Sequence, residues 1–243
     1  MSSINNVKQL PLSMWLRQSA SFDNYIAAAN QQLLNNLRNL VASTQERFLF
    51  LWGNEGVGKT HLLQAACRAA ASRKGSVYLP LQEADQFAPE MLEGLELMSL
   101  VAIDDLDAIA GDLSWETALF NLYNRVRDGD SCSLLVAARK PLVGLGLTLP
   151  DLKSRLGWGL VFQVHAMIDE EKVQALQQRA DDLGFELPDE VANYLLRHYQ
   201  RQTAALFNLL DQLDQHSLAE QRRLTIPFVK QVIDSEIENL KEK

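Results

Sequence analysis

The sequence has little with which to build covalent or metal cross-links. Only two of its 243 residues are cysteines, Cys67 and Cys132, and neither belongs to a CxxC pattern or lies near a histidine cluster. Both stand among apolar or small residues, as reduced thiols in a protein core do. The sequence therefore predicts neither a disulfide nor a cysteine-based metal site, and it favours the cytoplasm.

Basic residues are too few and too scattered to form a surface that binds duplex DNA. The formal net charge is −8; residues 1–166 carry 14 basic and 16 acidic side chains, and residues 167–243 carry 9 and 15. Proteins bind DNA phosphates through lysine and arginine side chains that displace condensed counterions. Neither part of the chain is expected to present such a face.

Long apolar runs are also missing. No stretch approaches the roughly 20 apolar residues that cross a bilayer, and the amino terminus lacks the basic and then apolar pattern of a signal peptide. The hydrophobic content of 47% is nevertheless sufficient for a large core. We expect a cytoplasmic protein without membrane contact, built as one large α/β domain or as a medium domain with a small companion.

Apolar runs alternate with helical patterns in the first two thirds of the chain, which predicts a parallel sheet covered on both faces. The expected strands are residues 48–52, 77–79, 100–103 and 134–138. The expected helices are residues 24–43, 60–73, 83–98 and 114–127.

The strand pattern disappears after about residue 167. The helical segments expected beyond it are residues 169–183, 188–199, 202–219 and 226–240. We therefore predict an extended arm at 1–21, an α/β domain at 22–166 and a small all-α domain at 167–243.

One segment matches the phosphate-binding pattern GxxxxGK[ST] in full, directly after an expected strand and directly before an expected helix. Its residues are Gly53, Asn54, Glu55, Gly56, Val57, Gly58, Lys59 and Thr60. In such a loop, backbone N–H groups face phosphate oxygens, the lysine neutralises the β/γ charge and the threonine hydroxyl binds Mg²⁺. The alternative, a glycine turn with an incidental lysine, requires all four fixed positions to coincide. The motif predicts a nucleoside phosphate bound with magnesium.

The strand expected at 100–103 runs into two carboxylates, Asp104 and Asp105. A carboxylate at this place holds the metal ion, and its neighbour can polarise an attacking water. We assign the first role to Asp104 and the second to Asp105, whose alternative is a solvated loop acid. Because glutamate is the commoner water-polarising residue, hydrolysis is less firmly predicted than binding.

The segment 152–160, LKSRLGWGL, contains Arg155. An arginine at a domain edge can enter a neighbouring active site and stabilise the charge of a transferring phosphoryl group, but it can equally be an ordinary surface residue. The residues alone leave both interpretations open.

Taken together, SFDNY at 21–25, the P-loop with His61 behind it, IDD at 103–105 and LKSRLGWGL resemble the AAA+ module of the bacterial replication initiator DnaA over roughly residues 20–240. The resemblance implies an AAA+ P-loop NTPase with a small all-α lid and makes Arg155 an arginine finger. It also places His61, Phe22 and Tyr25 at the nucleotide, although core packing is an equally good explanation of the two aromatic residues.

Two positions depart from the DnaA pattern. The sensor 1 position falls on residues 137–140, which lack the expected small acidic or amide side chain, and the sensor 2 arginine falls near Ala204, with Arg201 as a possible substitute. Both departures concern a γ-phosphate. The resemblance therefore implies a bound ADP or ATP with Mg²⁺, the diphosphate being favoured.

We expect no helix-turn-helix domain after the lid, and the chain thus resembles the Hda family of DnaA-related regulators. The arm residues Gln9, Leu10, Leu12 and Met14 are similar to the motif that docks on the β sliding clamp, the alternative being an arm that packs on its own domain. By this resemblance, a clamp-docked chain would insert Arg155 into the ATP site of DnaA and inhibit further initiation, reaching DNA only through the clamp.

Two other functions stay open at this stage. The chain could be a free-standing AAA+ ATPase that remodels or loads another protein, or a module that recruits partners without taking part in their chemistry. A homo-oligomer is compatible with either, because AAA+ modules commonly place nucleotides between subunits.

Overall fold

A computed structural model describes residues 20–42, 46–199, 203–220 and 225–241 of the chain. The arm residues Gln9, Leu10, Leu12 and Met14 and the lid residue Arg201 lie outside these ranges. The chain divides into two compact units. The first contains residues 35–52 and 60–163, and the second contains residues 23–34, 53–59 and the segment from 164 onward.

A five-stranded parallel sheet forms the centre of the first unit, in the order β2-β3-β4-β1-β5. The strands are β1 (Phe48–Trp52), β2 (Ser76–Pro80), β3 (Leu100–Asp104), β4 (Ser133–Ala138) and β5 (Leu160–Gln163). Every residue of β3 and β4 is buried. This burial is what continuous apolar runs predict for the inner strands of a parallel sheet, and the four expected strands are confirmed.

The edge strand β5 was not predicted from the sequence. It has only four residues, and exposed positions alternate with partly buried ones, so it lacks the apolar run of the other strands. Gly159 precedes it, and a Cβ atom at that position would collide with the carbonyl oxygen of Phe48. The absent side chain therefore lets β5 approach β1.

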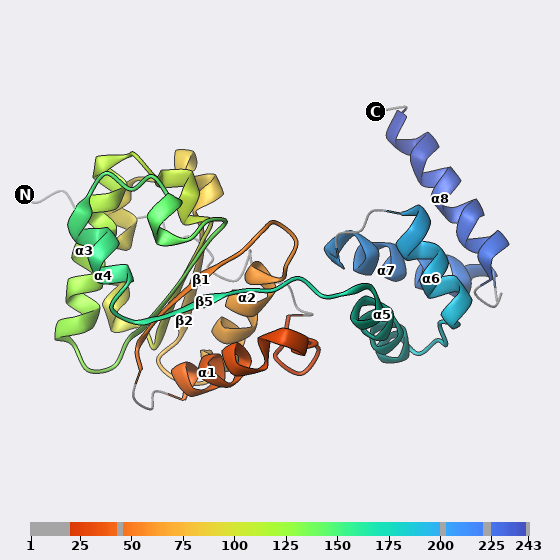
Figure 1. Cartoon of the computed structure of the whole chain (residues 1–243), viewed down its shortest axis with the longest axis horizontal. Helices are drawn as coiled ribbons and strands as arrows, with labels where there is room; N and C mark the ends of the chain where they lie inside the picture. Colours follow the sequence, from red (N-terminus) through yellow and green to blue (C-terminus); the bar gives the residue numbers. More distant parts are fainter. Residues whose placement is uncertain (1–19, 43–45, 200–202, 221–224, 242–243) are drawn as a thin grey trace, which may run out of the picture. The chain divides into compact units, whose positions relative to one another are not determined.

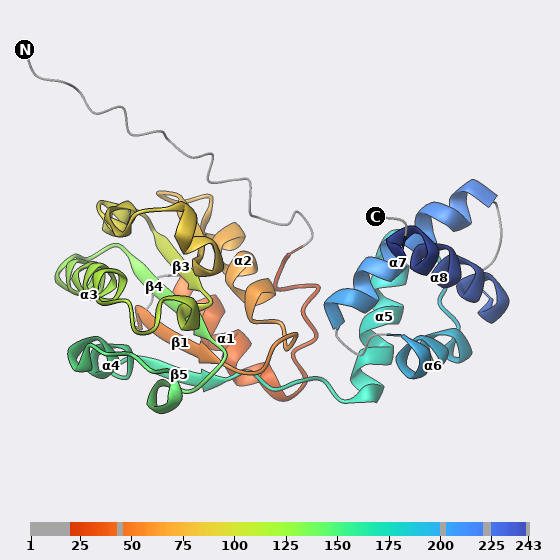
Figure 2. The same cartoon turned by 90° about the horizontal axis from the view of Figure 1, so that it is seen from above.

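Helices cover both faces of the sheet, as Figures 1 and 2 show: α3 and α4 lie on one face, and α1 and α2 on the other. They are α1 (Gln31–Val41), α2 (Lys59–Ala70), α3 (Leu113–Asp128) and α4 (Pro150–Leu156). Asp112 begins α3 by accepting hydrogen bonds from the backbone N–H groups of Ser114 and Trp115. An apolar cluster packs α3 and α4 against the sheet.

The helix predicted at 83–98 is wrong. The segment forms three short 3₁₀ turns, at Leu81–Gln86, Pro89–Leu92 and Leu95–Leu97. Pro89 cannot donate the backbone hydrogen bond that a continuing helix needs, and Gly94 adopts a left-handed backbone with φ 80°. These two residues interrupt an otherwise helical pattern.

The helix predicted from residue 24 begins later, with a 3₁₀ turn at Ala28–Asn30 that leads into α1. The buried Asn30 explains the difference. Its Nδ2 donates to the carbonyl oxygen of His165 at 2.9 Å, and its Oδ1 accepts from the backbone N–H of the same residue at 2.8 Å. These two long-range bonds fix the segment before α1, which local propensity does not report.

The second unit contains the helical segment that was predicted from the sequence. Its helices are α5 (Asp169–Leu183), α6 (Asp189–His198), α7 (Thr203–Glu220) and α8 (Ile226–Lys241). Leucines from α5, α6 and α7 meet Phe228 and Val229 of α8 in a separate apolar core. Among the residues that the structure describes, no helix is both long and apolar enough to cross a membrane.

Candidate functional site

The P-loop follows β1 directly and turns through two glycines with positive φ, Gly56 at 77° and Gly58 at 98°. Such angles are accessible to glycine and strained for other residues. Space is also restricted, because a Cβ atom at Gly58 would lie 3.1 Å from the ring of Tyr25. Glycine is thus required at position 58 by both the backbone and its surroundings.

The side chain of Lys59 is buried and folds back over the loop. Its Nζ donates to the carbonyl oxygens of Gly53 at 2.8 Å and Asn54 at 2.9 Å. A buried ammonium group is costly without such partners. The loop therefore holds a positive charge at its centre, as the motif predicts.

Thr60 and Asp104 are brought together, although 44 residues separate them. The Thr60 hydroxyl donates to Oδ2 of Asp104 at 2.6 Å, and Asp104 itself is only 1% exposed. Asp104 ends β3 and Thr60 lies in the first turn of α2, and two such oxygen atoms fit Mg²⁺, which takes oxygen ligands and completes its shell with water and phosphate. The arrangement is the one expected of a metal-side pair.

Tyr78 is a further part of this cluster that the sequence did not reveal. Its hydroxyl donates to Oδ2 of Asp104 at 3.0 Å from the neighbouring strand β2. Burial raises the pKa of Tyr78, and the adjacent Asp104 carboxylate raises it further. Tyr78 is therefore a neutral donor that holds the carboxylate in place.

Asp105 occupies the left-handed region, with φ 54° and ψ 48°, immediately after β3. Arg139, which follows β4 at the sensor 1 position, places its Nε 3.9 Å from an Asp105 carboxylate oxygen. The backbone N–H of Arg139 also donates to Asp107 at 2.6 Å. The water-polarising candidate thus faces a cation of its own chain.

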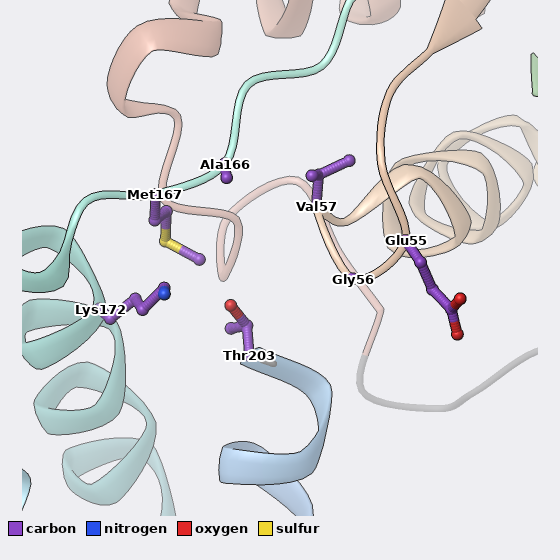
Figure 3. Close-up of a pocket in the computed structure, with 7 residues that line it drawn as sticks. All are labelled: Glu55, Gly56, Val57, Ala166, Met167, Lys172 and Thr203. Atoms are coloured by element: carbon purple, nitrogen blue, oxygen red, sulfur yellow. The ribbon is translucent and has the colours of Figure 1, made fainter. Parts of the chain in front are cut away.

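Within the second unit, a cavity of about 200 Å³ lies beside the P-loop. Its lining residues are Glu55, Gly56, Val57, Ala166, Met167, Lys172 and Thr203. Figure 3 shows Lys172 and Thr203 pointing toward the cavity, while the Glu55 carboxylate points away from it. The Lys172 ammonium lies 3.6 Å from Asp169. Sequence reasoning missed Lys172 and Thr203, because no local motif marks them.

The remaining nucleotide-side candidates differ in what they contact. The Tyr25 hydroxyl accepts a bond from Asn30 at 3.1 Å, and burial raises the pKa of Tyr25 to about 12 despite that bond. Phe22 is half-buried. The Nε2 atom of His61 lies 2.8 Å from the carbonyl oxygen of Ser21. The ring of Tyr25 lies directly against the P-loop, beside Gly58.

Arg155 belongs to a different part of the first unit. It lies near the end of α4, and this helix is on the opposite face of the sheet from α2 (Figures 1 and 2). Its guanidinium carbon is 4.0 Å from the centroid of the Trp158 ring, and Trp158 is 64% exposed. Across the described ranges, no carboxylate forms an ion pair with Arg155. The structure therefore does not bring Arg155 to Thr60 and Asp104.

This sheet order, with a P-loop after β1, a carboxylate at the end of β3 and an all-α lid, defines an AAA+ P-loop protein. The sequence matches the bacterial DnaA ATPase domain over residues 16–163 and the Hda lid domain over residues 169–233. The chain belongs to the bacterial DnaA ATPase-domain family, with a lid of the Hda type. The resemblance to Hda-like, DnaA-related proteins is confirmed, and it supports a role as a replication regulator.

Solved structures show the same fold. Domain III of the Thermotoga maritima replication initiation protein DnaA is 18% identical with a TM-score of 0.75, covering 90% of this chain and 98% of that one. AMPPCP-bound DnaA from Aquifex aeolicus is 19% identical with a TM-score of 0.67, covering 82% and 66%. A Thermotoga maritima RuvB variant is 16% identical with a TM-score of 0.68, covering 91% and 73%. The predicted AAA+ fold with an all-α lid is confirmed.

Proposed function

We propose that this protein stimulates ATP hydrolysis by DnaA through the arginine finger Arg155, and thereby prevents re-initiation of replication. One observation carries the proposal: Arg155, near the end of α4 in a DnaA-type domain, is only partly buried and stacks on the exposed Trp158. An arginine placed in this way is available to a neighbouring molecule. The Hda-type lid supports a regulator rather than an initiator.

Arg155 would act by electrostatic stabilisation of the transition state. In phosphoryl transfer, negative charge spreads over the oxygens of the transferring group, and a guanidinium supplied by a second protein stabilises that charge. Its planar donors match phosphate oxygens better than an ammonium group does. DnaA would provide the nucleotide, the metal and the attacking water, and this chain would provide Arg155.

The protein's own P-loop would hold ADP or ATP with Mg²⁺, the diphosphate being favoured. Lys59 would exchange its bonds to Gly53 and Asn54 for bonds to phosphate oxygens, while Thr60 and Asp104 would contribute oxygens on the metal side. The fold is shared with a DnaA that was solved with AMPPCP. Tyr25, and with it Phe22, would pack near the base.

Hydrolysis by the chain itself would be slow. Asp105 is one methylene shorter than the glutamate that commonly polarises water, and Arg139 lies 3.9 Å from its carboxylate. A cation at this distance competes with water for the carboxylate oxygens. The bound nucleotide would act as a structural ligand rather than as a substrate.

Docking would be provided by the arm, where Gln9, Leu10, Leu12 and Met14 resemble a clamp-binding peptide. An extended peptide can place a polar and an apolar anchor in separate pockets without folding on its own. The partners would be the β sliding clamp and DnaA, with DNA reached only through the clamp, in the cytoplasm. Self-association would be compatible with this arrangement.

The test is a DnaA ATP-hydrolysis assay with DNA-loaded clamp, comparing wild type, Arg155→Ala, Arg155→Lys and Gln9→Ala. We expect Arg155→Ala to bind nucleotide normally and yet lose stimulation by on the order of 10³-fold, with partial retention in Arg155→Lys. For Gln9→Ala, the addition of DNA-loaded clamp should no longer change the rate of DnaA ATP hydrolysis.

Equal stimulation by wild type and Arg155→Ala would refute the finger. If removal of residues 1–20 then abolished function, the chain would be a recruiting module. Rapid ATP turnover by the isolated chain would instead favour a free-standing ATPase.

A further inference from the structure

We propose that Glu116 is the positioning residue for Arg155: its buried carboxylate fixes the segment that leads into α4, and so sets where the finger stands. This inference rests on the proposed function of Arg155. Glu116 lies in the first turn of α3, outside every motif in the sequence.

The Glu116 side chain is 0% exposed and is surrounded by donors. Its Oε1 accepts from the backbone N–H of Gly111 at 2.7 Å and that of Thr148 at 3.1 Å. Its Oε2 accepts from the Thr148 backbone N–H at 2.9 Å, the Thr148 hydroxyl at 3.1 Å and the Leu149 backbone N–H at 2.7 Å. In each of these hydrogen bonds the Glu116 carboxylate is the acceptor, as it is when ionised.

A buried carboxylate is costly unless its charge is compensated. Among the described residues, no lysine or arginine forms an ion pair with Glu116, so the compensation comes from the donors of Gly111, Thr148 and Leu149. Burial alone would raise the pKa of Glu116, but the bonds from these donors outweigh it and lower the pKa below its usual value. Glu116 is therefore an anion at neutral pH, and the surrounding backbone is ordered around it.

The hydrogen bonds of Glu116 reach the start of α4, the helix that carries Arg155. Leu149 is the residue directly before α4, and no side chain of its own segment caps that helix. Helix α4 has only seven residues, with Leu152 and Leu156 buried beneath it. Because a helix this short is marginal alone, external contacts set its position. Glu116 supplies the contact at the start of α4, and Arg155 lies one residue from its end.

Gly111, the third residue that donates to Glu116, ties the carboxylate to the segment after β3. Gly111 ends the segment that follows β3 and Asp105, and its backbone has φ 94°. One carboxylate thus joins α3, the segment after β3 and the segment before α4. An apolar side chain could fill the same volume, but it could not hold the N–H groups of Thr148 and Leu149.

The experiment compares Glu116→Gln with wild type in the DnaA ATP-hydrolysis assay, with DNA-loaded clamp. Glutamine preserves the volume but directs an NH₂ group toward donors. The matched control is Thr117→Ala, which removes an exposed hydroxyl that bonds only within α3. Arg155→Ala and the double variant Glu116→Gln/Arg155→Ala complete the set.

We expect Glu116→Gln to lower the maximal stimulation by on the order of 10-fold or more, because small misplacements of a catalytic group are costly. The half-saturating concentration and nucleotide affinity should stay unchanged, and Thr117→Ala should match wild type. The double variant should lose no more than Arg155→Ala alone, because Glu116 acts only through the finger.

Wild-type stimulation by Glu116→Gln would overturn the inference, as would a raised half-saturating concentration with an unchanged maximum. If Glu116→Gln failed to fold, Thr148→Val, which removes a single bond to the carboxylate, should still lower the maximum a few-fold, and a wild-type maximum would refute the role. Wild-type stimulation of DnaA ATP hydrolysis by Arg155→Ala would instead refute the proposed function itself.

Discussion

The guanidinium of Arg155 lies 4.0 Å above the ring of Trp158, three residues further along the chain. The two side chains form a cation–π pair on the surface of the first unit, at the turn between α4 and β5. Trp158 is 64% exposed and Arg155 is partly buried, so the pair restricts the arginine while solvent still reaches it. If Arg155 acts as the proposed finger, the stacking partly orders it before a partner binds.

Replacing Trp158 by alanine should weaken the finger without removing it. An exposed cation–π pair contributes about 0.5–1 kcal/mol, so we expect a few-fold loss of DnaA ATPase stimulation in Trp158→Ala. Trp158→Phe, which keeps an aromatic face, should retain most of the activity. The readout is the rate of DnaA-bound ATP hydrolysis, and identical rates for all three proteins would show that the stacking has no role.

The Thr60–Asp104 pair predicts how nucleotide affinity depends on magnesium. Thr60→Ala and Asp104→Asn each remove an oxygen from the proposed metal side, so both should lose much of the affinity that Mg²⁺ adds, on the order of 10-fold. Thr60→Ser keeps the hydroxyl and serves as the control. Titration of a fluorescent nucleotide with Mg²⁺ and with EDTA measures the difference; an unchanged magnesium dependence would contradict the assignment.

The two glycines of LKSRLGWGL should respond differently to alanine. At Gly159 the new methyl group would collide with the Phe48 carbonyl oxygen, whereas at Gly157 its nearest neighbour would be 3.5 Å away. We expect Gly159→Ala to lower the free energy of unfolding by about 1–3 kcal/mol, and Gly157→Ala to change it little. Urea denaturation of both variants tests this; equal stabilities would mean that β5 can move away from β1.

Glu116 predicts a component of acid sensitivity. Its pKa in the folded protein lies below the ordinary value of 4.5, so its ionised form stabilises the fold at pH values above the unfolded pKa. That contribution is lost as the pH falls through the folded pKa. Glu116→Gln lacks it at every pH. The difference in unfolding free energy between wild type and Glu116→Gln should therefore shrink as the pH falls from about 6 to about 3; a constant difference would refute a lowered pKa.

Much of the fold follows from local sequence patterns. The buried strands are continuous apolar runs, and α5 to α8 follow helical periodicity, so their approximate bounds could be predicted. The 3₁₀ turns at 81–97 and the late start of α1 could not. The 3₁₀ turns arise because Pro89 and Gly94 interrupt a helical pattern. The late start of α1 depends on the hydrogen bonds between Asn30 and His165, which are distant in sequence.

The candidate site divides in the same way. Thr60 and Asp104 stand in motifs whose place at strand ends brings them together, and the structure has them in contact. Tyr78, Glu116 and Lys172 belong to no motif. Tyr78 reaches Asp104 across neighbouring strands, Glu116 binds residues more than 30 positions away, and Lys172 meets the P-loop cavity from the lid. Such residues become visible only once the chain is folded.

The contact between Arg139 and Asp105 bears on how long a nucleotide stays bound. If the protein's own chemistry is slow, the occupancy of its P-loop is set by association and dissociation, and not by turnover. The nucleotide in the P-loop would then follow the ratio of free ADP to ATP around the protein. It would not change with the time since the nucleotide bound.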